Sequence, residues 1–133
     1  MDNVVWFSEI QENGLPKVGG KALNLGIMYK LKFPVPPGFV VTTDAYKQFL
    51  KENKLIHPIS KILSSTNQNN PQEVTEASKQ IYELIINSEI PFDIKKDIEE
   101  SYEILNVSPE IVKNGGNALD IVKMGRDTPY VAV

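Results

Sequence analysis

The stretch that most limits how this chain can fold is FPVPPG, residues 33–38, in which three of the residues are proline. Proline fixes φ at about −65° and has no backbone N–H, so a helix cannot run through such a stretch. The chain must therefore cross it in an extended form. It then enters the β-prone run Phe39 to Thr42, which we expect to be a buried strand. Val4 to Phe7 has the composition of a second short strand.

Most of the remaining sequence has helical patterns. Apolar residues between Gly19 and Lys32 fall on several sides of a helix. This predicts a helix that begins at the two glycines and is buried on much of its circumference. Asn70, Pro71 and Glu73 are typical of a capped helix start. Further elements are expected as helices over 43–52, over 55–63, after Pro91 and after Ser108, and as a last strand over 130–133.

These elements predict an α+β fold that is mostly helical, with a few short strands. The two helices that begin at Pro71 and after Pro91 each carry an apolar stripe. We expect these two helices to form an antiparallel hairpin. At 133 residues with 41% hydrophobic residues, the chain has the size and composition of one ordinary domain.

Composition excludes several function classes. The net charge is −3 with both signs mixed along the chain, so no basic stripe is present and no nucleic-acid partner is expected. Cysteine is absent, which excludes disulfides, thiolate zinc sites and a thiol nucleophile. The first residues do not fit a signal peptide, and no apolar run approaches the roughly 20 residues of a membrane span. We therefore expect a cytoplasmic protein with no membrane partner.

The segment that carries chemistry is VGGKALNLG, residues 18–26, where Gly19 and Gly20 precede Lys21 at an expected helix start. The first N–H groups of a helix lack internal partners and carry partial positive charge, so such an end attracts anions. A lysine there is mildly unfavourable unless an anion offsets it. The alternative is that the glycines merely start a helix and Lys21 extends into water. The residues alone favour this alternative, since the segment lacks the spacing of a P-loop or of G-x-G-x-x-G.

Four segments resemble the N-terminal ATP-binding region of the phosphoenolpyruvate synthase (pyruvate, water dikinase) family. They are VVWFSEI, VGGKALNLG, PVPPGFVVTTDAYKQFL and the final MGRDTPYVAV. The resemblance implies that residues 1–133 are the N-terminal part of an ATP-grasp-type nucleotide-binding domain. Pyruvate phosphate dikinases and rifampicin phosphotransferases share this domain, so membership of one of these groups is an alternative. A non-catalytic helical interaction module is another.

The resemblance also implies the roles of individual residues. Lys21 would contact ATP phosphates and stabilise their charge, and Gly19 and Gly20 would give backbone room and N–H donors. No catalytic residue and no metal ligand is expected in this chain. The implied reaction converts ATP, pyruvate and water to AMP, phosphoenolpyruvate and phosphate through a phosphohistidine.

The same resemblance implies cofactors and partners outside these residues. The cofactors would be ATP and Mg²⁺, with the metal ligands outside this chain. The partners would be the phosphohistidine and pyruvate-binding domains of the full-length enzyme. In the family the last strand runs on into an R-S-S-A-T motif, which this sequence does not reach. We therefore expect one wall of an ATP site and no activity of the isolated chain.

Several other residues have a simpler explanation than a functional one. His57 is the single histidine, and we interpret it as a surface or helix-start residue rather than a phosphocarrier. Trp6 and Phe7 are expected in the core. Arg126 is expected at the surface or in a local ion pair. A solvated helix face, rather than a metal site, is expected for Asp97, Glu99, Glu100 and Glu103 beside Lys95 and Lys96.

Overall fold

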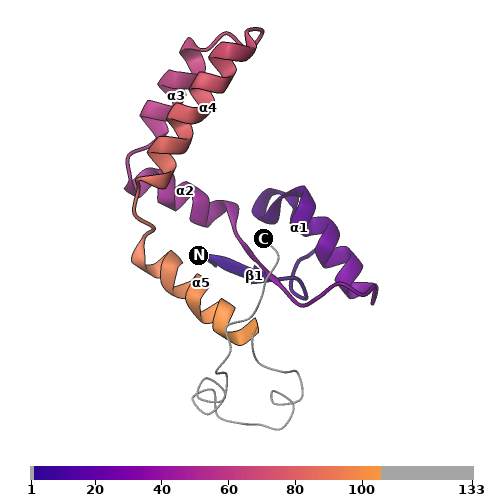
Figure 1. The fold of residues 1–133 in the computed structure, drawn as a ribbon. Coiled ribbons are helices and arrows are strands. Elements are labelled where there is room, and N and C mark those ends of the chain that lie inside the picture. Colours follow the sequence, from indigo (N-terminus) through magenta and orange to yellow (C-terminus); the bar gives the residue numbers. More distant parts are fainter. Residues whose placement is uncertain (1, 106–133) are drawn as a thin grey trace. The chain divides into compact units, whose positions relative to one another are not determined.

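The computed structural model describes residues 2–105, and it is mostly helical with one small sheet, as the sequence predicted (Figure 1). The helix expected after Ser108, the strand expected over 130–133 and Arg126 lie outside the described residues. The elements in chain order are β1 (Val4–Trp6), α1 (Leu15–Lys30), β2 (Phe39–Val41), α2 (Thr43–Glu52), α3 (Ile56–Ser65), α4 (Pro71–Ile86) and α5 (Phe92–Leu105).

The chain divides into two compact units. One unit contains residues 2–45 and 92–105 of the described part, and the other contains residues 46–91. The first unit holds β1, α1, β2 and α5, and the second holds α3 and α4. The boundary falls within α2, after Ala45. All the candidate ATP-binding residues, Gly19, Gly20 and Lys21, belong to the first unit.

The sheet of the first unit is an antiparallel pair in which Val5 faces Val40. Each strand is one residue shorter than the sequence predicted. The expectation that the second strand is buried is wrong, since Val40 is half-buried and Val41 is 43% exposed. The physical reason is that, within residues 2–105, the sheet has only two strands and so offers few neighbouring side chains to cover both of its faces.

The core of the first unit joins the sheet to α1 through a loop residue. Val5, Ile10 and Ala22 are buried against one another. Ile10 lies so close to the α1 backbone that a Cβ added to Gly26 would stand 2.8 Å from the Ile10 Cβ. The helix and the loop can therefore touch only because residue 26 has no side chain.

Helix α1 contains a break at Gly19. Its φ of 78° and ψ of 168° lie in a backbone region that is essentially restricted to glycine. A first turn precedes the break and begins at Leu15, because Pro16 suits the first turn of a helix. The predicted start at the two glycines is therefore four residues too late for the whole of α1, yet a regular helical segment does begin at Gly20.

The prediction that this helix is buried on much of its circumference is wrong. Only Ala22 and Gly26 of α1 are buried. Several of its large apolar side chains are more than a third exposed, among them Leu25 and Met28. The apolar residues on several sides of the helix therefore do not all serve the core of this unit.

Polar contacts attach α5 to the start of β1. The Asn3 Nδ2 donates to the Asp97 Oδ2 at 2.8 Å, and Asn3 is 5% exposed. The Ser101 Oγ, also buried, donates to the Asp97 main-chain oxygen at 2.7 Å. The Asn3 carbonyl in turn accepts from the Thr42 N–H at 2.9 Å. Asn3 thus connects α5 to the end of β2.

The second unit contains a helical hairpin of α3 and α4. The predicted cap of α4 is confirmed: the Asn70 Oδ1 accepts from the Gln72 and Glu73 N–H groups at 3.1 and 3.4 Å. Glu73 accepts from the Asn67 N–H, rather than from the Asn70 N–H of a standard capping box. The hairpin predicted between α4 and α5 is wrong, because α4 pairs with α3 whereas α5 contacts β1 in the other unit.

We expect Gly19→Ala to lower the free energy of unfolding by about 1–3 kcal/mol, since alanine resists the backbone conformation at this position. Space is not the reason, because a Cβ at Gly19 would meet nothing within 4 Å. Gly20→Ala is the matched control and should leave stability unchanged or raise it by up to about 1 kcal/mol. Urea unfolding of both variants measures this. Equal stabilities for the two variants would contradict the break at Gly19.

We expect Asn3→Ala to cost about 1–3 kcal/mol, because the half-buried Asp97 carboxylate loses its side-chain donor. Glu99→Ala on the same helix is the control, since its ion pair with Lys95 is exposed and 3.8 Å long. That variant should change the free energy of unfolding by less than about 0.5 kcal/mol. A negligible effect of Asn3→Ala would show that Asn3 does not hold α5.

Candidate functional site

The predicted ATP-binding residues lie together at the break in α1. Gly19 is half-buried, and Gly20 and Lys21 are exposed. The regular helical segment begins at Gly20, so its first N–H groups have no acceptor within that segment. Lys21 extends from the same turn. An exposed lysine beside the partly positive end of a helical segment is an arrangement that can bind a phosphate group.

The lysines near α1 differ in their partners. The stretch from Leu15 to Phe33 contains four lysines and no acidic residue. The Lys17 Nζ lies 2.9 Å from the Asp2 carboxylate, and the Lys30 Nζ donates to the Ile10 main-chain oxygen. Among residues 2–105, the side chain of Lys21 has neither an ion pair nor a hydrogen-bond partner. Of Lys17, Lys21 and Lys30, only Lys21 is thus left uncompensated within the described part of the chain.

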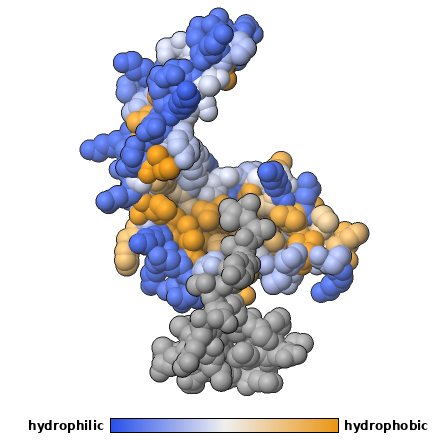
Figure 2. All heavy atoms as spheres, viewed as in Figure 1, coloured by the Kyte–Doolittle hydropathy of each residue, from blue (hydrophilic) through white to orange (hydrophobic). Residues whose placement is uncertain are grey.

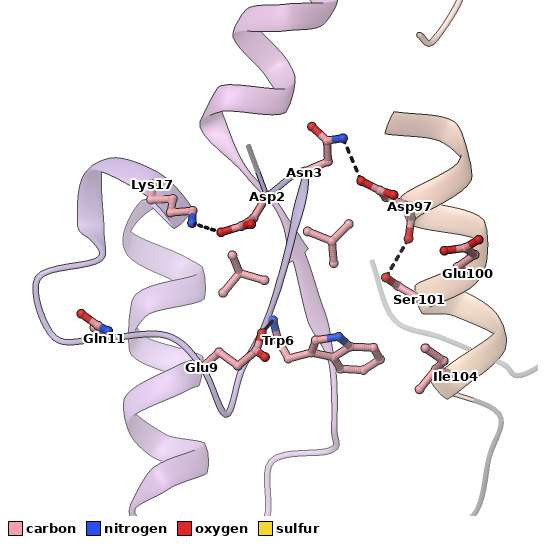
Figure 3. Close-up of a pocket in the computed structure, with 12 residues that line it drawn as sticks. Asp2, Asn3, Trp6, Glu9, Gln11, Lys17, Asp97, Glu100, Ser101 and Ile104 are labelled. Carbon is pink, nitrogen blue, oxygen red and sulfur yellow. Dashed lines mark hydrogen bonds and ion pairs between the residues drawn. The ribbon is translucent and has the colours of Figure 1, made fainter. Parts of the chain in front are cut away.

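A surface pocket of about 670 Å³ lies elsewhere in the first unit, between β1, the loop after it and α5 (Figure 3). Lys17 lines this pocket, but Gly19, Gly20 and Lys21 do not. Its lining residues are Asp2, Asn3, Val4, Val5, Trp6, Glu9, Gln11, Lys17, Asp97, Glu100, Ser101 and Ile104. The lining thus includes four carboxylates and one lysine, and this excess of negative charge disfavours a polyphosphate.

The pocket carboxylates already have partners within the protein. The hydrogen bond from Lys17, together with its positive charge, lowers the pKa of Asp2. The Glu9 carboxylate accepts from the Trp6 N–H at 3.0 Å, and Figure 3 shows Asp97 directed toward Asn3. Glu100 lies 3.6 Å from the Lys96 Nζ. Each carboxylate of the pocket therefore has a partner within the protein, and none of them needs a ligand to account for its presence.

The remaining sequence interpretations have mixed outcomes. His57 is exposed in the first turn of α3, and the ion pairs of Lys95 and Lys96 confirm a solvated face on α5. Asp97 departs from that face because it is half-buried against Asn3. No local pattern could reveal this contact, since the two residues are 94 positions apart. Phe7 packs against the core as expected.

Trp6 is half-buried rather than fully in the core. Its ring packs edge-on against Phe39 with centroids 5.5 Å apart, and it also lines the pocket. Within the described range, no group of three or more His, Cys, Asp or Glu side chains is placed to hold a metal ion. No helix of that range has both the length and the apolar character to cross a bilayer.

Comparison with known proteins identifies the family of a large part of this chain. Residues 15–117 match a family model described as the pyruvate phosphate dikinase AMP/ATP-binding domain. The match begins at the first residue of α1 and includes Gly19, Gly20 and Lys21.

Similar proteins bear the name of one enzyme. A probable phosphoenolpyruvate synthase of Methanocaldococcus jannaschii is 41% identical over 79% of this chain and 9% of its own length. A phosphoenolpyruvate synthase of Aeropyrum pernix is 39% identical over 77% of this chain and 13% of its own. A probable phosphoenolpyruvate synthase of Methanothermobacter thermautotrophicus is 33% identical over 98% of this chain and 17% of its own. The chain spans less than a fifth of the length of these relatives, and it belongs to the pyruvate phosphate dikinase AMP/ATP-binding domain family.

Proposed function

We propose that this chain forms one wall of the ATP site of a phosphoenolpyruvate synthase. The observation that carries the proposal is the position of Lys21, which has no partner in the described part of the chain and follows the break at Gly19. This position lies inside the matched AMP/ATP-binding domain. The names of the relatives favour a synthase over the other phosphotransferases that share the domain.

In this proposal, Gly19, Gly20 and Lys21 have distinct tasks. The Gly19 backbone turns the chain so that a regular helical segment starts at Gly20, which places Lys21 in the first turn of that segment. Gly20 has no side chain, and the space beside it is open, because an added Cβ would meet only Leu15, at 4.0 Å. A phosphate group can therefore approach the backbone at this position. The Lys21 ammonium then stabilises phosphate charge by electrostatics and exchanges no proton with the substrate.

The remaining chemistry lies with groups beyond residues 2–105. ATP supplies the phosphoryl group, and Mg²⁺ neutralises phosphate charge when it is bound. We propose that the metal ligands, the phosphohistidine and the pyruvate site belong to other parts of a longer ATP-grasp-type enzyme. The isolated chain then binds ATP weakly and transfers no phosphoryl group. A cytoplasmic location also remains part of the proposal.

We expect Lys21→Ala to weaken MgATP binding by about tenfold or more, because a charge-assisted contact with phosphate contributes about 1.5–3 kcal/mol. Isothermal titration calorimetry of the isolated chain measures the dissociation constant. Lys32→Ala is the matched control: it removes the same charge from an exposed site beyond the end of α1, and should change affinity by less than about twofold at physiological salt. If the two variants lost MgATP affinity equally, the loss would come from the lower net positive charge and not from a contact of Lys21. That result would refute the assigned site.

A further inference from the structure

Helix α1 carries an apolar face that the described residues leave open. Leu31 is 64% exposed and Phe33, just beyond the helix, is 54% exposed. Hydrophobic residues are visible at the surface of the α1 region in Figure 2. We define the α1 apolar face by its members, which are Leu25, Ile27, Met28, Leu31 and Phe33.

The backbone at the end of α1 determines where Phe33 lies. The Phe33 N–H donates to the Met28 oxygen at 3.1 Å and the Lys32 N–H donates to the Tyr29 oxygen at 3.1 Å. With Lys32 at a φ of 63°, this is a Schellman ending, which brings the residue at position 33 toward Met28. The face therefore continues from the helix onto the start of the proline-rich stretch.

The α1 apolar face also lies in line with the proposed phosphate contact. Lys21, Leu25 and Met28 follow the spacing i, i+4 and i+7, which places them on one side of a helix. Ala22 and Gly26, which are buried, lie on a different side of the helix. A surface that covers the apolar face would thus reach Lys21 at its edge.

We propose that the α1 apolar face docks against the rest of the ATP-binding domain, so that ATP phosphates lie at the edge of that interface beside Lys21. This inference rests on the proposed function. The partner surface has an apolar centre with acidic or polar groups at its rim, since the side chain of Lys21 at the edge of the face has no acidic partner among residues 2–105. The relatives hold more than four fifths of their length outside the matched segment and can supply such a surface.

Charge argues against a second copy of this chain as the occupant. A two-fold interface brings the same patch together from both copies. Lys21, at the edge of the α1 apolar face, would then face a patch of the other copy in which the stretch from Leu15 to Phe33 has lysines and no carboxylate. Like charges in such an interface are destabilising.

Hydroxyl-radical footprinting without ATP tests the proposal and is independent of nucleotide binding. One sample is the isolated chain. The other sample is the full-length Methanothermobacter relative in which this chain replaces the matched stretch. This relative is suitable because its match covers 98% of this chain. Modification of Met28 and Phe33 should fall several-fold in the longer protein relative to Tyr82 of α4, which is 61% exposed. Equal reactivity in the two samples would overturn the proposal.

A second experiment needs no chimera. Met28→Lys in the isolated chain should leave its urea midpoint unchanged, because Met28 is 41% exposed, and sedimentation velocity should show a monomer. Lysine at the aligned position of the full-length relative should lower its melting temperature by several degrees.

A concentration-dependent dimer of the isolated chain that Met28→Lys dissociates would assign the face to a second copy. A destabilised isolated variant would show that the chain covers the face itself. Either of these two results would overturn the proposal, and so would an unchanged melting temperature of the full-length variant.

Discussion

The backbone conformation of Gly19 is the constraint on which the proposed site depends. A φ of 78° with a ψ of 168° ends one helical turn and starts another segment one residue later. Without this break α1 would continue from Leu15, and Lys21 would lie in the second turn of a continuous helix rather than in the first turn of a helical segment. The break therefore places a helix start, with its partial positive charge, beside Lys21. A single glycine thus converts the interior of a helix into a surface suited to an anion.

Tight packing further along the chain holds this segment against the rest of the first unit. Ile10 contacts α1 where Gly26 has no side chain, and Lys30 donates to the Ile10 carbonyl. Asn3, at the start of β1, accepts from the Thr42 N–H and donates to Asp97 of α5. Of these contacts, those of Ile10 lie where Ala22 and Gly26 are buried in α1. The side that carries Lys21 stays open, which is the common basis of the proposed ATP site and the proposed docking face.

Local signals predicted much of the fold, and contacts between distant residues account for most of what they missed. Asn70 with Pro71 predicted the start of α4, and the prolines of residues 33–38 predicted the extended entry to β2, because each acts on its own backbone. The partner of α4 depends on which apolar surfaces meet in the fold, and α4 pairs with α3 rather than with α5. The role of Asp97 depends on a residue 94 positions away. The burial of α1 was overestimated because apolar residues also occur at protein surfaces, so their number on a helix does not fix how much of it is buried.

The candidate site was predicted through resemblance more than through spacing. Physical reasoning alone favoured a plain helix start at Gly19 to Lys21. The matched family, which is described as an AMP/ATP-binding domain, is what suggests a nucleotide as the ligand. The most direct test is to map where ATP contacts the isotope-labelled chain by NMR. The account predicts that the largest amide shifts occur at Gly19, Gly20 and Lys21. Largest shifts at Asn3 and Trp6, in the acidic pocket, or within α3 and α4 would contradict it.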